Sequence, residues 1–223
     1  MDIERKNEYL RVLYHELGHW FVAKQVGFNP LYIKVKSEWA STWVSSGHCS
    51  TALYCLCKQE NVTDYLIDRQ LVLLAGAVFE AVYLNVSTEC AIYNLQNDTA
   101  SNDNEKFMEL AMLSLNLLLG KFGSKVDDLY ERSNKLQRDC LHEEILMHRK
   151  DLVEIIFLVC RNKINHFFDE VGCIFDDYLE SQGDIGEVEI PSEALDIAYK
   201  SIIKDVYFFK DASAFRKGFF RNL

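Results

Sequence analysis

Several features that define other classes of protein are scarce in this sequence of 223 residues. It has only two prolines and ten glycines, which leaves little room for a disordered linker. Its longest apolar run, Leu71 to Phe79, is far shorter than the ~20 residues that a membrane-spanning helix needs. No Gly-x4-Gly-Lys-Ser/Thr segment occurs. We therefore expect no transmembrane segment and no nucleotide-binding phosphate loop.

Positive charge is also in short supply, because 24 Lys and Arg face 34 Asp and Glu, for a formal net charge of −10. This balance disfavours nucleic-acid binding, which depends on neutralising phosphates. The cysteines number seven and are scattered from Cys49 to Cys173, which does not suit a disulfide framework. The segment Met1 to Lys6 has no apolar signal character. We expect a cytoplasmic protein that does not bind nucleic acid.

The stretch His15-Glu16-Leu17-Gly18-His19 carries the strongest functional information. Residues four apart lie above one another on a helix, so His15 and His19 can bind one metal ion. Glu16 projects to one side of them and can accept a proton from water without being a ligand. The pattern predicts a zinc hydrolase with Glu16 as general base. The alternatives are a structural histidine pair or a decayed site.

Apolar residues surround this motif, so we expect a buried helix over about Glu8 to Lys24. Gly18 inside that helix costs roughly 1 kcal/mol relative to alanine. Such a cost indicates that another part of the chain approaches the helix backbone closely.

The remaining pattern predicts a mainly α fold with a small β-sheet (α+β). We expect one domain with two parts: a core over residues 1–125 that carries the motif, which the family resemblance given below implies is a zinc peptidase core, and a C-terminal helical part over 126–223. A loop of roughly fifteen residues should follow the second helix. The expected elements are a strand at Leu31–Lys36, one or two strands within Trp39–Cys57, helices at 64–86 and 104–119, two helices within 127–182, a break at 183–186 and a last helix from Ser192 to about Phe209.

Three further features are noted outside the motif. His48 with the Cys55-x-Cys57 pair is a candidate second metal site, although such residues usually belong to the core or the surface. Residues 211–223 interleave phenylalanines with basic side chains. That tail suits docking on a partner or an anionic membrane surface, but packing on its own domain is the expectation.

Three segments resemble the peptidase domain of the FtsH family of zinc peptidases, in the same order and with roughly the same spacing across residues 10 to 115. The motif followed by Val22-Ala23 is similar to the family's His-Glu-Ala-Gly-His-x-x-Val-Ala. Leu73-Leu-Ala-Gly-Ala-Val-Phe-Glu80 resembles its Leu-Leu-Gly-Gly-Arg-Ala-Ala-Glu helix. Ser101-Asn-Asp-Asn-Glu-Lys106 resembles its Ser-Asn-Asp-Leu-Glu-Arg segment, whose aspartate is the third zinc ligand.

The resemblance implies that Asp103 joins His15 and His19 as a zinc ligand, with Asp98 in reserve. The plain alternative for Asp103 is a helix cap. Glu80 could orient a ligand histidine or form a buried ion pair. The strand residues between Trp39 and Cys49 would border the cleft and pair with an extended peptide.

The sequence also departs from the family. Ala75-Gly76-Ala77 replaces the glycine pair and arginine, and the connection before Asp103 is longer. Because no phosphate loop occurs, we expect the family's ATPase module to be absent. We therefore expect substrates that are flexible or unfolded polypeptides, or that another protein delivers. The expected partners besides substrate are a delivery protein or further copies of the chain in a homo-oligomer. Two other hypotheses remain: an ImmA-type gluzincin that cleaves a specific regulator, with Glu80 as third ligand, and a non-catalytic FtsH-like adaptor module. The ImmA family's Glu-Ala-Asn-x-Phe-Ala segment is missing.

Overall fold

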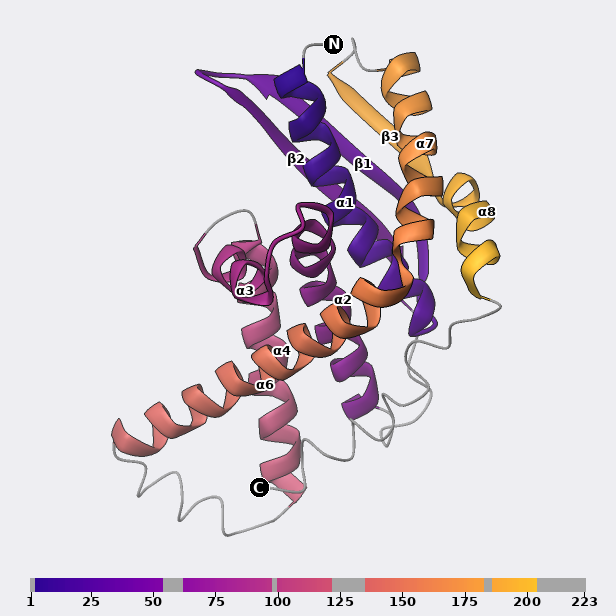
Figure 1. Ribbon diagram of the computed structural model, residues 1–223. Helices are drawn as coiled ribbons and strands as arrows, with labels where there is room; N and C mark the ends of the chain where they lie inside the picture. Colours follow the sequence, from indigo (N-terminus) through magenta and orange to yellow (C-terminus); the bar gives the residue numbers. More distant parts are fainter. Residues whose placement is uncertain (1–2, 54–61, 98–99, 122–134, 183–185, 204–223) are drawn as a thin grey trace.

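Helices and a small antiparallel sheet make up the fold, as the sequence predicts (Figure 1). The computed structural model describes residues 3–53, 62–97, 100–121, 135–182 and 186–203. The elements are α1 (Ile3–Gln25), β1 (Asn29–Trp39), β2 (Trp43–Ala52), α2 (Val62–Tyr83), α3 (Thr88–Asn97), α4 (Ser101–Lys121), α6 (Lys135–Lys163), α7 (Asn165–Gln182), β3 (Glu187–Pro191) and α8 (Ser192–Ile203). No described helix is long and apolar enough to cross a bilayer.

The sheet has the strand order β2-β1-β3, so β1 is central and β2 lies at an edge. Both pairings are antiparallel. Ile33 and Val35 of β1 are fully buried, as are Val188 and Ile190 of β3 on the neighbouring strand. This alternation places one apolar face of the sheet against the helices, because side chains in a strand point to opposite faces in turn.

Helix α1 packs on the sheet and also on α2, and it carries much of the hydrophobic core (Figure 1). Its Tyr9, Trp20 and Phe21 side chains are fully buried. The expected close approach at Gly18 is confirmed: a Cβ atom there would lie 2.3 Å from the carbonyl oxygen of Ala75 on α2. Glycine therefore lets the two helix backbones touch beside the motif.

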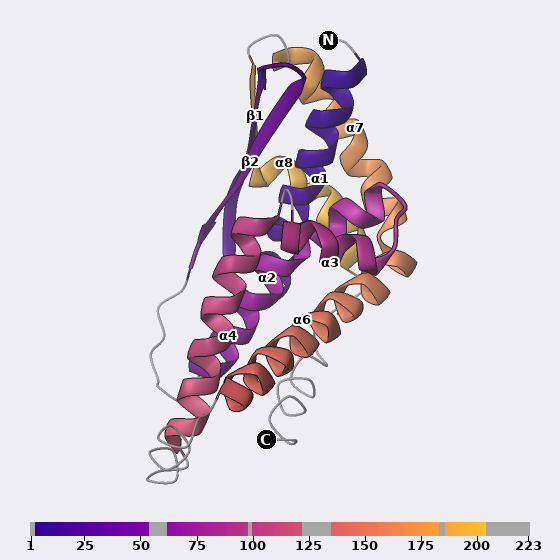
Figure 2. The same cartoon turned by 90° about the vertical axis from the view of Figure 1, so that its left-hand side faces the viewer.

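Polar contacts fix α2, α4 and α6 to one another, and Figure 2 shows the three helices together below the sheet. Gln70 of α2 donates to Ser114 Oγ of α4 at 3.0 Å, and His148 Nε2 of α6 donates to Gln70 Oε1 at 2.9 Å. Burial lowers the pKa of His148 to about 4, so the ring is neutral near pH 7. Arg149 of α6 bonds Asn104 at the start of α4. The bond from Arg149 to Asn104 thus holds the first turn of α4 in place.

The structure corrects several of the expected elements. Helix α3 occupies much of the segment expected to be a loop, and β3 is a strand that was not predicted. Helix α4 begins at Ser101, three residues before the expected start, so Asp103 lies within its first turn. The expected end of the last helix at Phe209, the tail at 211–223 and the Cys55-x-Cys57 pair lie outside the described residues.

Candidate metal centre

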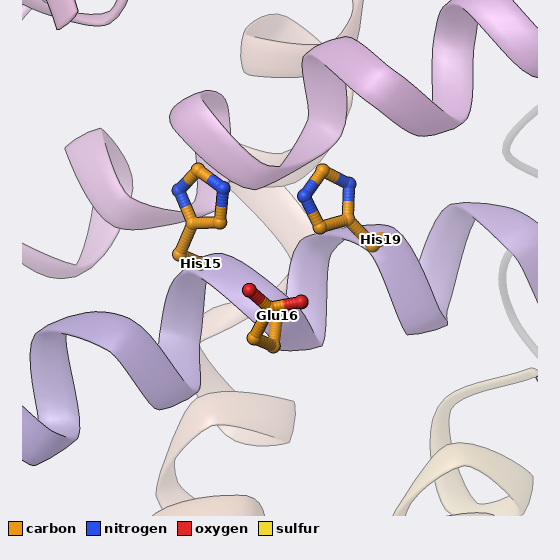
Figure 3. A group of neighbouring side chains, drawn as sticks. All are labelled: His15, Glu16 and His19. Carbon is orange, nitrogen blue, oxygen red and sulfur yellow. The ribbon is translucent and has the colours of Figure 1, made fainter. Parts of the chain in front are cut away.

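The two motif histidines point to the same side of α1, and Figure 3 shows their rings next to each other with the Glu16 carboxylate displaced from them. Their ring centroids are 4.9 Å apart. His15 is 7% exposed and His19 is 8% exposed. Buried imidazoles need polar partners, because burying an unsatisfied polar group costs several kcal/mol, on the order of 2 to 7. The partners of these two rings define the site.

The structure brings Asp103 to both histidines. Its Oδ2 atom lies 3.2 Å from His15 Nε2 and 3.2 Å from His19 Nε2. Asp103 comes from the first turn of α4, where a negative charge also interacts favourably with the helix dipole. Two histidines of α1 and an aspartate that is far from them in the sequence thus direct one nitrogen or oxygen atom each toward a common point.

The other ring nitrogens are held by hydrogen-bond acceptors. His15 Nδ1 donates to Glu80 Oε2 at 2.9 Å, and His19 Nδ1 donates to the carbonyl oxygen of Val72 at 2.7 Å. The second oxygen of Glu80 accepts a bond from Arg11 Nη1 at 2.7 Å. A neutral imidazole that donates through Nδ1 has a lone pair on Nε2. In the neutral form, both rings would therefore direct a lone pair toward the Asp103 carboxylate.

This donor set fits a bound zinc ion. Two unprotonated nitrogens and a carboxylate oxygen cannot hydrogen-bond to one another without a shared cation, either a proton or a metal ion. Ligand atoms about 2.0 Å from a tetrahedral centre are about 3.3 Å apart, close to the observed 3.2 Å. Donation of the outer N–H to a carboxylate or a carbonyl is the usual arrangement for metal-binding histidine.

The electrostatics of the site also favour a cation. Burial alone would lower the pKa of His15, but the Asp103 and Glu80 carboxylates raise it to about 10. Burial alone would raise the pKa of Asp103, but His19 and His15 hold it well below its usual range. The field that stabilises a proton on these rings would stabilise a metal ion at the same point.

Gly76 of α2 provides the space at the point where the ligand atoms converge. A Cβ atom there would lie 2.5 Å from His19 Nε2 and 2.6 Å from His15 Nε2. Any side chain at this position would therefore occupy the volume next to both ligand nitrogens. The sequence placed Gly76 in a family-like helix but gave no indication of this contact.

We expect Gly76→Ala to displace both rings and to reduce zinc affinity by at least about 100-fold, because a metal site tolerates only small errors in ligand position. Zinc titration of the purified chain measures the change. The matched control is Gly172→Ala in α7, where the added methyl group would meet only the Tyr14 hydroxyl at 3.3 Å. Wild-type zinc affinity in the Gly76 variant would show that this gap is not the metal position.

Glu16 is 7% exposed and lies between α1 and the edge strand. A Cβ atom on Gly47 of β2 would be 2.4 Å from Glu16 Oε1, so glycine lets the strand pass close to the carboxylate. The ligand atoms of His15, Glu16 and His19 lie within 4.8 Å of one another. The carboxylate is thus near the predicted metal position but does not share the hydrogen bonds that join the two histidines to Asp103.

A cleft of about 570 Å³ opens over these side chains. The edge strand β2 forms one wall with residues from Ser45 to Thr51, and α2 and α4 form the other. The part of β2 that borders the cleft thus overlaps the stretch expected from the sequence and extends beyond Cys49. His48 lines the cleft as well, but no second metal cluster surrounds it in the described ranges. Asp98 lies outside those ranges.

No protein-family model and no curated protein sequence matches this chain.

Proposed function

We propose that the chain is a zinc metallopeptidase with an FtsH-peptidase-like site that hydrolyses flexible or unfolded polypeptide without ATP. The observation that carries the proposal is the convergence of His15 Nε2 and His19 Nε2 on Asp103 Oδ2, each at 3.2 Å, beside the buried Glu16 and under a cleft. Three protein ligands with one open position are the arrangement of catalytic zinc, whereas structural zinc usually has four.

His15, His19 and Asp103 would hold the metal. Zinc bound there supplies Lewis acidity, which polarises a peptide carbonyl and lowers the pKa of water toward neutrality. Glu16 accepts the proton of the attacking water and returns it to the leaving amine. Glu80 and the Val72 carbonyl orient the two rings through their Nδ1 atoms. Burial of these groups excludes competing water from the ligand nitrogens.

The contacts of Glu80 favour Asp103 over Glu80 as the third ligand. Glu80 approaches His15 from the Nδ1 side and its other oxygen bonds Arg11, so both oxygens already have partners. A metal bound to Nε2 would lie on the opposite edge of the ring. The ImmA-type arrangement, in which Glu80 is a ligand, would require this carboxylate to leave both partners.

The edge strand supports a polypeptide as the substrate. Strand β2 pairs with β1 on one side, and it borders the cleft beside Glu16. An extended peptide can add to such an edge through main-chain hydrogen bonds, which tolerate many sequences. A folded domain does not present an extended segment, and this sequence has no phosphate loop to power unfolding. Flexible segments, or chains delivered by a partner or within a homo-oligomer, are therefore the expected substrates.

We expect the pure chain to degrade an intrinsically disordered protein without ATP and to spare a stable globular domain. If local opening of the domain costs about 5 kcal/mol, only about one molecule in several thousand exposes a cleavable segment, and the rate falls in proportion. Gel or mass-spectrometric time courses with and without ATP measure both rates.

Two results would contradict the proposal in different ways. ATP-stimulated digestion of the folded domain would show that unfolding is coupled to nucleotide hydrolysis after all. No cleavage of either substrate by the zinc-loaded chain would instead favour the non-catalytic adaptor hypothesis.

A further inference from the structure

The cleft is charged unevenly along its length. Among its described lining residues the carboxylates are Glu16 and Asp103, and both belong to the metal centre. Arg69 and Lys106 also line the cleft, on the walls formed by α2 and α4. Of the side chains that β2 contributes to the wall, His48 is the one that can carry a positive charge, and Ser45, Ser46, Ser50 and Thr51 carry none. The permanent positive charges that line the cleft therefore come from the helices.

Arg69 lies on the face of α2 that borders the metal centre. Val72, whose carbonyl binds His19, is one turn further along that face, and Gly76 is two turns further. Seven residues of helix correspond to about 10 Å along the axis. The Arg69 guanidinium is 6.0 Å from the centre of the Phe28 ring, and it makes no hydrogen bond or ion pair with the residues that the structure describes.

Lys106 follows Asp103 by one turn of α4 and is exposed. It too has no ion-pair partner within the described part of the chain. At the Arg11 end of the cleft the situation differs, because Arg11 is neutralised by Glu8 and by Glu80 at 2.7 Å each. Several lysines elsewhere also have acidic partners: Lys6 with Asp176, Lys24 with Asp196 and Lys34 with Glu187.

We propose that Arg69 and Lys106 select peptides that carry an acidic side chain about three residues from the scissile bond; this inference rests on the proposed peptidase function. An extended peptide rises about 3.3 Å per residue, so 10 Å corresponds to about three residues. Two cations, Lys106 one turn from Asp103 and Arg69 two turns from Gly76, suit side chains along an extended chain better than a single terminal carboxylate. Because both groups are partly or fully exposed, each contributes a factor of a few rather than of thousands.

The test uses synthetic peptides that share one cleavable bond and differ only in Glu, Gln or Lys at positions two to four residues to either side. Each peptide is made with a free and an amidated C-terminus. The full-length zinc-loaded chain is compared with Arg69→Glu/Lys106→Glu, with the milder Arg69→Gln/Lys106→Gln, and with Lys200→Glu. Lys200 is an exposed residue of α8 outside the cleft, so that variant makes the same change in net charge as the glutamine double variant.

We expect the wild type and Lys200→Glu to cleave the Glu peptide with a kcat/KM about five- to tenfold above that of the Lys peptide. The glutamine variant should lose the preference and the glutamate variant should reverse it. Added salt should reduce the preference, since exposed charges are screened. Equal cleavage by the wild type, an unchanged preference in the double variants, or a dependence on the free C-terminus alone would overturn the inference.

A binding measurement separates this inference from the proposed function. Fluorescence anisotropy of labelled Glu and Lys peptides is recorded with the Glu16→Gln chain, in which hydrolysis does not compete. Selective binding of the Glu peptide that is lost in the Arg69/Lys106 double variants supports the inference about charge selection. If the wild type binds in this way but cleaves no peptide, the proposed peptidase function is rejected and the inference about charge selection stands. Absence of both cleavage and selective binding rejects both.

Discussion

Glu16→Gln is expected to lower peptide hydrolysis by at least about 1,000-fold, while the chain still binds zinc with unchanged stoichiometry. The amide has nearly the same shape as the carboxylate but cannot accept the proton of water, and general base catalysis contributes about 10² to 10⁴ in rate. Glu16 makes none of the hydrogen bonds that hold His15, His19 and Asp103 together. Peptide cleavage rates and zinc content by elemental analysis, measured on the same preparation, test both parts.

The matched control is Glu4→Gln, which makes the same chemical change at an exposed position at the start of α1. It should retain wild-type activity and zinc content. Wild-type turnover in Glu16→Gln would reject the mechanism. Loss of zinc together with activity would show that Glu16 helps to hold the metal, so that the loss of activity would no longer identify a base.

Asp103→Ala is expected to weaken zinc binding by more than about 100-fold. Loss of a hydrogen bond that only orients a coordinating side chain weakens binding by about 10- to 100-fold, and loss of a coordinating atom should exceed that range. The substitution removes one coordinating atom outright, and two histidines alone leave an incomplete catalytic set. Competition with a chromophoric chelator measures the affinity. Hydrolysis should fall with metal occupancy.

Two other carboxylates provide the comparison. Glu80→Ala should cost about 10- to 100-fold in zinc affinity, because His15 loses the acceptor that orients its ring. Asp98→Ala should leave the affinity unchanged. If Glu80→Ala proves to be the variant that no longer binds zinc, the ImmA-type ligand set replaces the one proposed here. If Asp98→Ala does so, the reserve ligand is the correct one.

Long elements with strong hydrophobic patterns were predictable from the sequence, and short ones were not. Helices α1 and α2 bury most of their surface, so their apolar residues marked them clearly. Helix α3 buries only Ala91 and Leu95 and has ten residues, too few for a helical period to stand out. Strand β3 alternates Val188 and Ile190 with glutamates, but five residues that end in a proline resemble a loop until β1 is known to pair with them.

The parts of the metal centre were predictable to different degrees. Helical spacing alone placed His15, Glu16 and His19 together, whereas Asp103 came from a family resemblance, because no local pattern relates residues so distant in the chain. The Val72 carbonyl could not be found from the sequence, since every residue has one. The space at Gly76 likewise depends on how α1 and α2 pack, which is a property of the fold and not of the segment.

The proposed ligands lie on two helices that are far apart in the chain: His15 and Asp103 are separated by 88 residues. A zinc ion that binds only when α1 and α4 meet would link the free energy of unfolding to the free zinc concentration. Each tenfold rise in zinc above the dissociation constant would add about 1.4 kcal/mol, which raises Tm by roughly 3 to 5 °C in a chain of this size. Zinc supply would then govern the lifetime of the folded protein as well as its turnover.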